Sequence, residues 1–241
     1  RFKRITELDD FDASLPRGRL GIHDEYTMQV QLDELAEEKE PFFSVLFTLS
    51  THAPFDMPVD SMIDYGYKDE VNKYLNSARY TDACLGEYFR KARQQSWYAN
   101  TLFILIADHS HFSQKGWDYY APPYHKIPLL FYGEVIDTHF RGLARSVMGS
   151  QVDLPATLLS QMDIDNSEFH WSRDLMIPGI PQFAYVAFEE GIGWFRPGNY
   201  FFYDKRFDHY YCKHLEEDKE EAYIREGKSF LQCVFEEYLE M

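Results

Sequence analysis

The sequence predicts an α/β fold in which helices flank a mostly parallel sheet. Residues 42–49 and 102–107 are two predominantly apolar runs, as is typical of strands buried on both faces of such a sheet. Residues 69–95 lie between them and repeat apolar side chains at the helical period, which indicates a long amphipathic helix. A strand, a helix and a strand in this order form a βαβ unit, whose right-handed crossover makes both strands parallel in one sheet.

Two further helices are predicted, one before and one after this unit. Residues 24–39 place apolar side chains near one face, and Asp24 caps the helix. Residues 150–159 contain a shorter helix, which Asp153 caps and which carries Pro155 in its first turn. Both agree with a sheet that is flanked by helices.

The last part of the chain predicts a different arrangement. Residues 127–132 form a third strand, and Pro128 places this strand at an edge or makes its first residues a strand entrance. Aromatic runs within residues 183–212 alternate with Gly, Pro and Asp turns, which predicts a small antiparallel meander. A closing helix is predicted from about residue 219 to residue 239.

Composition limits the classes of function. The chain has 24 basic and 40 acidic residues, a formal charge of −16, which excludes nucleic acid as a partner because such binding requires neutralisation of phosphates by Lys and Arg. No apolar run approaches the roughly 20 residues that a membrane-spanning helix needs. The three cysteines form no CxxC pair, so they indicate neither a zinc site nor a redox motif.

Asp108 and His109 are the first candidate site. They end the apolar run 102–107, and in open α/β sheets ligands collect at the carboxyl ends of strands. An Asp beside a His offers one oxygen and one nitrogen donor to a divalent metal. The alternative is a solvated turn at the end of a buried strand.

Two other histidines extend this candidate site. His52 follows the predicted strand 42–49, so its loop is expected to open on the same sheet edge as Asp108 and His109. His125 precedes the third strand, where it binds substrate or a second metal, or is a structural imidazole bonded to a backbone carbonyl. Both alternatives for His125 stay open from the residues alone.

Five segments resemble one known family when they are taken in order. They are FSVLFTLSTHAPF (43–55), YTDACLGEYF (80–89), ILIADH (104–109), HKIPLLF (125–131) and VDLPATLL (152–159). Together they are similar to the carboxyl-terminal half of the lipoteichoic-acid-synthase-like branch of the sulfatase and alkaline phosphatase superfamily. The resemblance covers residues 20–180 and implies an alkaline-phosphatase-like fold. Residues 1–180 are then half of a sulfatase-like catalytic domain, to which residues 181–241 add the meander and the closing helix.

The resemblance implies a transferase that moves a phosphoglycerol-type head group from a lipid donor to a cell-envelope glycan acceptor. In such enzymes a Thr attacks the phosphodiester and forms a covalent intermediate. One divalent metal, typically manganese with zinc and magnesium as alternatives, is held by a Glu, that Thr, an Asp and a His. Carried onto this sequence, Asp108 and His109 are the metal ligands, and His52 contacts the substrate phosphate. His125 is a further candidate for substrate binding, from its position before the third strand.

The resemblance also implies parts that this sequence does not show. The nucleophilic Thr, its partner Glu and an amino-terminal membrane anchor are expected upstream of residue 1, so the chain alone is expected to be inactive. The catalytic domain would face the periplasm or cell exterior from the cytoplasmic membrane. Ser110 stands where many relatives have Gly, and the role of His111 stays open.

Two alternatives to the transferase remain. One is a sulfatase or phosphodiesterase of the same superfamily, although a sulfatase needs a Cys/Ser-x-Pro-x-Arg motif, which this sequence lacks. The other is a catalytically inactive domain that binds envelope glycans or acts as a scaffold.

Overall fold

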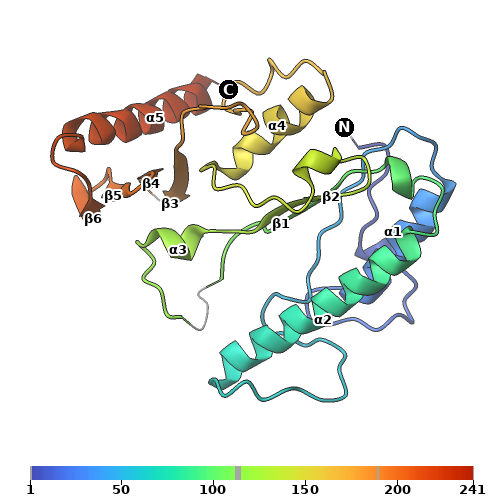
Figure 1. Cartoon of the computed structure of the whole chain (residues 1–241). Helices are drawn as coiled ribbons and strands as arrows, with labels where there is room; N and C mark the ends of the chain where they lie inside the picture. The colour runs from blue at the N-terminus through green and yellow to red at the C-terminus, as the bar shows by residue number, and fades with distance from the viewer. Residues whose placement is uncertain (1, 112–114, 189, 241) are drawn as a thin grey trace. The chain divides into compact units, whose positions relative to one another are not determined.

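The computed structural model divides the chain into two compact units (Figure 1). The first consists of Arg1–Ile106 and Pro128–Arg141, and the second of Ala107–Ile127 and Gly142–Met241. The predicted grouping into residues 1–180 and 181–241 of one domain stays a prediction. The residues that the structure describes are 2–111, 115–188 and 190–240.

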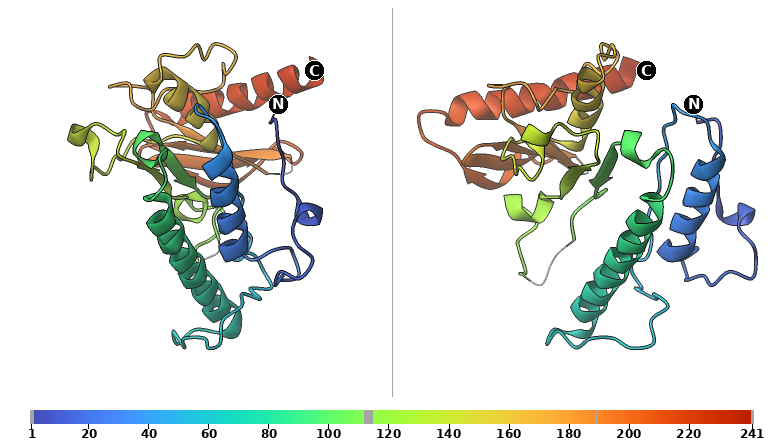
Figure 2. Two further views of the ribbon diagram at one scale, coloured as in Figure 1. Left: turned by 90° about the vertical axis from the view of Figure 1, so that its right-hand side faces the viewer. Right: turned by 45° about the vertical axis from the view of Figure 1, so that its right-hand side comes forward.

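Two long helices form the core of the first unit, α1 (Asp24–Glu37) and α2 (Asp69–Ala92). They lie side by side in both views of Figure 2. Both helices were predicted from their apolar periodicity, and both are confirmed. The side chains buried between them and the following turn are mainly large and apolar: Met28, Leu32, Leu35, Tyr80, Cys84, Tyr88, Trp97 and Tyr98. Burial of this apolar surface is the main stabilising contribution in the unit.

The strands of the first unit are β1 (Phe103–Ile106) and β2 (Leu129–Tyr132), and both were predicted. Their pairing is antiparallel, with Phe103 opposite Tyr132, so the expected parallel sheet is not what these two strands form. A parallel connection requires a crossover element that packs on the sheet, usually a helix. Among the described residues of the connection from β1 to β2, the helical element is α3 (Pro122–His125), which has 4 residues.

Residues 42–49 are assigned to no strand in the part of the chain that the structure describes, so the predicted βαβ unit is wrong at its first strand. Phe43 and Phe47 are 71% and 75% exposed, which contradicts the expected burial on both faces. An apolar run of this length shows that the segment favours burial, but it does not supply the neighbouring strand whose hydrogen bonds would make it part of a sheet.

The second unit contains the predicted meander, whose four strands pair in the order β3-β4-β5-β6 and are all antiparallel. The closing helix α5 (Glu220–Glu240) packs on it, and Gly227 permits the close approach, since a Cβ there would lie 2.6 Å from the Phe201 ring. The strands span Ala184–Phe188, Gly191–Arg196, Asn199–Asp204 and His209–His214.

The remaining helices are short. The second unit has η4 (Gln151–Asp153) continuing into α4 (Leu154–Gln161), which confirms the predicted helix there. The first unit has three 3₁₀ turns, Leu8–Asp10, Tyr98–Asn100 and Thr138–Phe140. Within the described ranges, none of the helices combines the length and the apolar character that crossing a bilayer demands.

Candidate functional site

Asp108 and His109 lie in the second unit, directly after the residues of β1 in the chain. Both side chains are exposed, 74% for Asp108 and 71% for His109. Oδ2 of Asp108 lies 3.8 Å from Nε2 of His109, and Oδ1 accepts a hydrogen bond of 2.8 Å from the His109 amide. The two residues, adjacent in the sequence, therefore also bring a carboxylate oxygen and a ring nitrogen close together in space.

The His109 ring is oriented by its own backbone. Nδ1 lies 2.7 Å from the Ser110 carbonyl oxygen, and because a carbonyl only accepts, Nδ1 carries the proton. Nε2 then has its lone pair free for a cation. Histidines that bind metals usually donate their other ring N–H to a carboxylate or a backbone carbonyl in this way.

This donor pair fits a divalent metal in distance and chemistry. Bonds from such an ion to nitrogen and oxygen are about 2.0–2.2 Å long, so one ion bridges donors up to about 4 Å apart. The 3.8 Å between Asp108 Oδ2 and His109 Nε2 lies within this limit. Residues 2–111, 115–188 and 190–240 hold no group of three His, Cys, Asp or Glu side chains arranged for a metal.

A glutamine contacts the backbone that carries this pair. Nε2 of Gln151, the first residue of η4, donates to the carbonyl oxygens of Ala107 at 2.8 Å and of Asp108 at 2.7 Å. Sequence reasoning missed this contact, because more than 40 positions separate Gln151 from its partners and no local pattern marks it.

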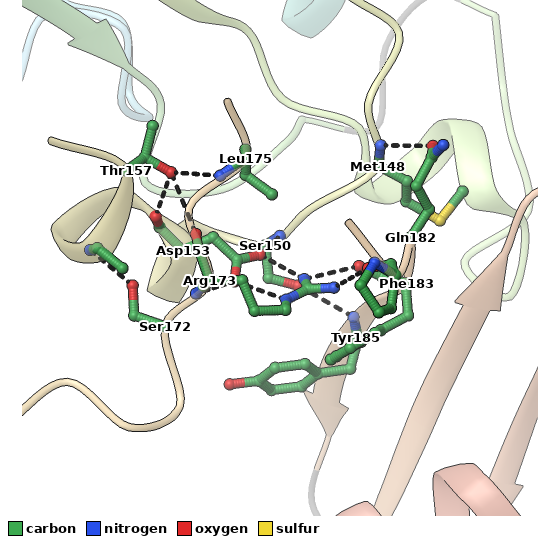
Figure 3. A network of polar contacts seen from close by, with 12 residues as sticks. Met148, Ser150, Asp153, Thr157, Ser172, Arg173, Leu175, Gln182, Phe183 and Tyr185 are labelled. Carbon is green, nitrogen blue, oxygen red and sulfur yellow. Dashed lines mark hydrogen bonds and ion pairs between the residues drawn. The ribbon is translucent and has the colours of Figure 1, made fainter. Parts of the chain in front are cut away.

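A buried ion pair joins Asp153, which closely follows Gln151 in the sequence, to Arg173 (Figure 3). The Asp153 carboxylate is fully buried and accepts two hydrogen bonds from the Arg173 guanidinium, at 2.9 and 2.5 Å. The same guanidinium donates to the carbonyl oxygens of Pro181 and Phe183. The prediction that the Asp153 side chain caps the helix is wrong, because this side chain makes no capping bond to α4. It accepts the Ser150 amide and the Arg173 guanidinium instead, and so joins η4 to the segment that leads into the meander.

His52 lies in the first unit, in the turn that follows residues 42–49, and its side chain is exposed. Nδ1 lies 2.8 Å from the Ala53 carbonyl oxygen, so it donates there and Nε2 is the nitrogen left for a substrate. The expectation that this loop opens on the same sheet edge as Asp108 and His109 depended on a strand at 42–49, which the structure does not have. That His52 acts with this pair stays a prediction, since the residues belong to different units.

A buried carboxylate holds the start of the His52 turn. Asp24 is fully buried, and its Oδ1 accepts the amides of Leu49 and Ser50 at 2.8 and 3.1 Å. Its Oδ2 accepts the Thr81 hydroxyl of α2 at 2.6 Å. The prediction that Asp24 caps α1 is wrong, because the N-cap is His23 and Asp24 is the first residue of the helix. Its carboxylate joins α1 to α2 and to the turn before His52.

Replacement of Thr81 by valine is expected to lower the free energy of unfolding by about 1.5–3 kcal/mol, the usual contribution of a hydrogen bond to a charged group. Thr27→Val is the matched control, because the Thr27 hydroxyl donates to the backbone carbonyl of Asp24 rather than to its carboxylate. Urea-induced unfolding of both variants measures the difference. Equal destabilisation would contradict a special role for the Asp24 carboxylate.

His125 ends α3 in the second unit and packs among aromatic rings, with Tyr119, Tyr124 and Phe202 centroids 5.1–5.4 Å away. Its Nε2 donates to the Tyr119 carbonyl oxygen at 2.7 Å, the contact expected of a structural imidazole. Burial lowers the pKa of this imidazole below its ordinary value of 6.5. The ring is therefore neutral near pH 7, with Nδ1 as an acceptor.

The lowered pKa of His125 has a consequence for stability. The imidazole is protonated more readily in the unfolded chain than in the folded chain. The contribution of the neutral, buried ring to folding stability is therefore fully present above pH 6.5 and is lost as the pH falls from 6.5 through the folded-state pKa. His125→Gln is expected to weaken this pH dependence. Melting temperatures of parent and variant between about pH 5 and 8 measure it, and parallel curves would contradict the burial of the imidazole.

The fold is that of the alkaline phosphatase superfamily. A crystal structure of a protein of that superfamily from Vibrio parahaemolyticus matches 90% of this chain and 55% of its own, with a TM-score of 0.70 and 26% identity. The lipoteichoic acid synthase LtaP from Listeria monocytogenes matches 93% of this chain and 61% of its own, with a TM-score of 0.71 and 17% identity. The predicted fold class is confirmed at this level, apart from the strand pairing described above.

The chain belongs to the sulfatase family, whose model, described as Sulfatase, matches residues 2–164. The lipoteichoic acid synthase-like protein YvgJ of Bacillus subtilis is 24% identical over 75% of this chain and 32% of its own length. The lipoteichoic acid synthase of Staphylococcus saprophyticus is 32% identical over 37% of this chain and 14% of its own. The resemblance to the lipoteichoic-acid-synthase-like branch is thus confirmed, and the chain spans a third or less of these two relatives.

Proposed function

We propose that this chain is part of a metal-dependent transferase that moves a phosphoglycerol-type head group from a lipid to a cell-envelope glycan. The observation that carries the proposal is the geometry of Asp108 and His109, whose donor atoms lie 3.8 Å apart with the imidazole Nδ1 already bonded to a carbonyl. Membership of the sulfatase family and similarity to lipoteichoic acid synthases support it.

In this proposal Asp108 and His109 are two of the ligands of one divalent ion, with Mn²⁺ favoured over Zn²⁺ and Mg²⁺. The bound ion supplies a Lewis acid that stabilises negative charge on phosphoryl oxygens and lowers the pKa of a bound hydroxyl. The remaining ligands, a Glu and the nucleophilic Thr, belong to a segment before residue 1. The partial coverage of the relatives supports such a segment, and this chain alone is not expected to turn over substrate.

The two histidines take different roles towards the substrate. His52 holds its Nδ1 on the Ala53 carbonyl, which leaves Nε2 as the ring atom that contacts a phosphate oxygen of the substrate. His125 is neutral with a proton on Nε2, so its Nδ1 accepts a hydrogen bond and suits a hydroxyl group of the substrate rather than a phosphate. His52 belongs to the first unit and His125 to the second, and the two roles are proposed independently of each other.

The site of action in this proposal is the outer side of the cytoplasmic membrane, to which a segment outside this chain anchors the catalytic domain. The formal charge of −16 would repel this chain from an anionic bilayer. Access to the lipid donor would therefore depend on that anchor rather than on adhesion of this surface.

Product analysis tests the reaction class. The complete protein is incubated with Mn²⁺, vesicles of a phosphoglycerol lipid labelled in its head group, and an envelope glycan acceptor. Label in the glycan together with diacylglycerol is the expected result. Release of free glycerol phosphate would identify a phosphodiesterase, hydrolysis of a sulfate ester would identify a sulfatase, and failure of every substrate would leave the inactive binding domain.

A further inference from the structure

The side-chain amide of Gln151 is bonded to two successive peptide groups. Its Nε2 donates to the carbonyl oxygens of Ala107 and Asp108, at nitrogen–oxygen distances of 2.8 and 2.7 Å. An amide nitrogen has two protons to donate, so both are used on this one stretch of backbone. The two carbonyls flank the Cα atom of Asp108, the first of the paired residues.

These two bonds determine the backbone conformation at Asp108. The Ala107 carbonyl belongs to the peptide plane before the Asp108 Cα, and the Asp108 carbonyl belongs to the plane after it. Because peptide groups are planar, the orientations of these planes set φ and ψ of Asp108, and with them the direction of its Cα–Cβ bond. The second plane also contains the His109 amide, which donates to Asp108 Oδ1 at 2.8 Å.

Gln151 is itself held on a fixed support. It begins η4, a turn in which the Ser150 amide donates to Asp153 Oδ2 at 2.8 Å and the Asp153 amide donates to the Ser150 carbonyl at 3.0 Å. Asp153 is the buried partner of Arg173 (Figure 3). Contacts therefore run without a break from a buried ion pair, through one turn of helix, to the backbone of Asp108 and His109.

We infer that Gln151 is a positioning residue for Asp108 and His109 as metal ligands, an inference that rests on the proposed function. Its amide holds the two donors at a separation that one ion bridges, before any ion binds. Gln151 is exposed and bonds carbonyls that are near solvent, so its main effect is on ligand geometry rather than on the stability of the fold.

The test uses the complete protein and the Gln151→Ala variant, titrated with Mn²⁺ while electron paramagnetic resonance reports the free ion. We expect the Mn²⁺ dissociation constant to rise about 10- to 100-fold, as is usual when a residue that supports a metal ligand is removed. Gln151→Glu keeps the length but replaces the donors with acceptors, so it should not restore affinity. The melting temperature should stay unchanged.

Gln161→Ala is the matched control, because Gln161 is an exposed amide in the next helix that contacts Asp174 instead of the Asp108 backbone. A metal-free readout accompanies the titration: hydrogen exchange at the amides of residues 108–110 should be faster in Gln151→Ala than in Gln161→Ala. This measurement reports positioning directly, without turnover.

An Asp108→Ala variant separates failure of the inference from failure of the proposed function. Loss of Mn²⁺ binding in Asp108→Ala with unchanged affinity and exchange in Gln151→Ala would overturn the role of Gln151 and leave the metal site intact. Equal Mn²⁺ binding by the parent and Asp108→Ala would overturn both, because the pair would then not be the metal site. Weakened binding in both variants, with Gln161→Ala like the parent, supports the inference.

Discussion

Replacement of Asp108 by alanine in the complete protein is expected to lower the rate of head-group transfer on the order of 1,000-fold. A metal ion contributes several kcal/mol to the stabilisation of charge on transferring phosphoryl oxygens, and each 1.4 kcal/mol corresponds to about a factor of ten in rate. Asp108 Oδ2 lies 3.8 Å from His109 Nε2, within the distance that one ion bridges, so its removal takes away the oxygen ligand of the proposed pair. Initial rates with labelled lipid measure the effect.

Asp137→Ala is the control for this prediction. Asp137 and His139 form another exposed Asp–His pair, 2.8 Å apart, in a 3₁₀ turn of the first unit. Removal of that carboxylate is expected to leave the rate unchanged. If Asp137→Ala and Asp108→Ala retain the same rate as the parent, then the geometry of the Asp108 pair has no catalytic significance.

Replacement of Asp153 by alanine is expected to lower the free energy of unfolding by about 3–5 kcal/mol, because it leaves the Arg173 guanidinium without its buried partner. The Asp153 side chain is fully buried and that of Arg173 is 15% exposed, so water does not substitute for the lost carboxylate. For a chain of this size each kcal/mol shifts the melting temperature by about 2–4 °C. Calorimetry should therefore show a fall on the order of 10 °C.

Two variants calibrate the effect of Asp153→Ala. Asp153→Asn keeps an acceptor for the Ser150 amide but removes the charge, so its melting temperature should lie between those of parent and Asp153→Ala. Glu87→Ala breaks an exposed pair with Arg90 and is expected to have little effect. A melting temperature for Asp153→Ala that equals that of Glu87→Ala would rule out a structural role for the buried pair.

Helices and the meander were predictable because their signals are local. The 3.6-residue repeat of apolar side chains located α1 and α2 within a few residues of their observed ends. Turn residues between aromatic runs predicted the meander, in which β4 and β5 are joined at Pro197 and Gly198, with Gly198 at φ +73°. In these elements a short window of sequence contains most of the information that determines the secondary structure.

Strand pairing was not predictable in the same way. The runs 42–49 and 102–107 are both apolar, but hydropathy does not specify which strand lies beside which or in which direction. The first run belongs to no strand and leaves Phe43 and Phe47 exposed, and the second contains β1, whose partner β2 is antiparallel. Both outcomes depend on contacts between segments far apart in the chain.

The residues of the candidate site also differ in whether a local sequence signal identifies them. Asp108 and His109 were identifiable because they are adjacent in the sequence and end an apolar run. Gln151, which contacts their backbone, and Asp24, which holds the turn before His52, were not identifiable as such. Their partners lie 25 or more positions away, and the chemistry of a lone Gln or Asp indicates no particular partner.

The most direct test of the central claim is pulsed electron paramagnetic resonance of Mn²⁺ bound to the complete protein. Coordination by His109 Nε2 predicts a coupling to one imidazole nitrogen in the parent that disappears in His109→Ala and persists in His139→Ala, the histidine of the control pair. The same nitrogen coupling in His109→Ala as in the parent would contradict a metal site at Asp108 and His109.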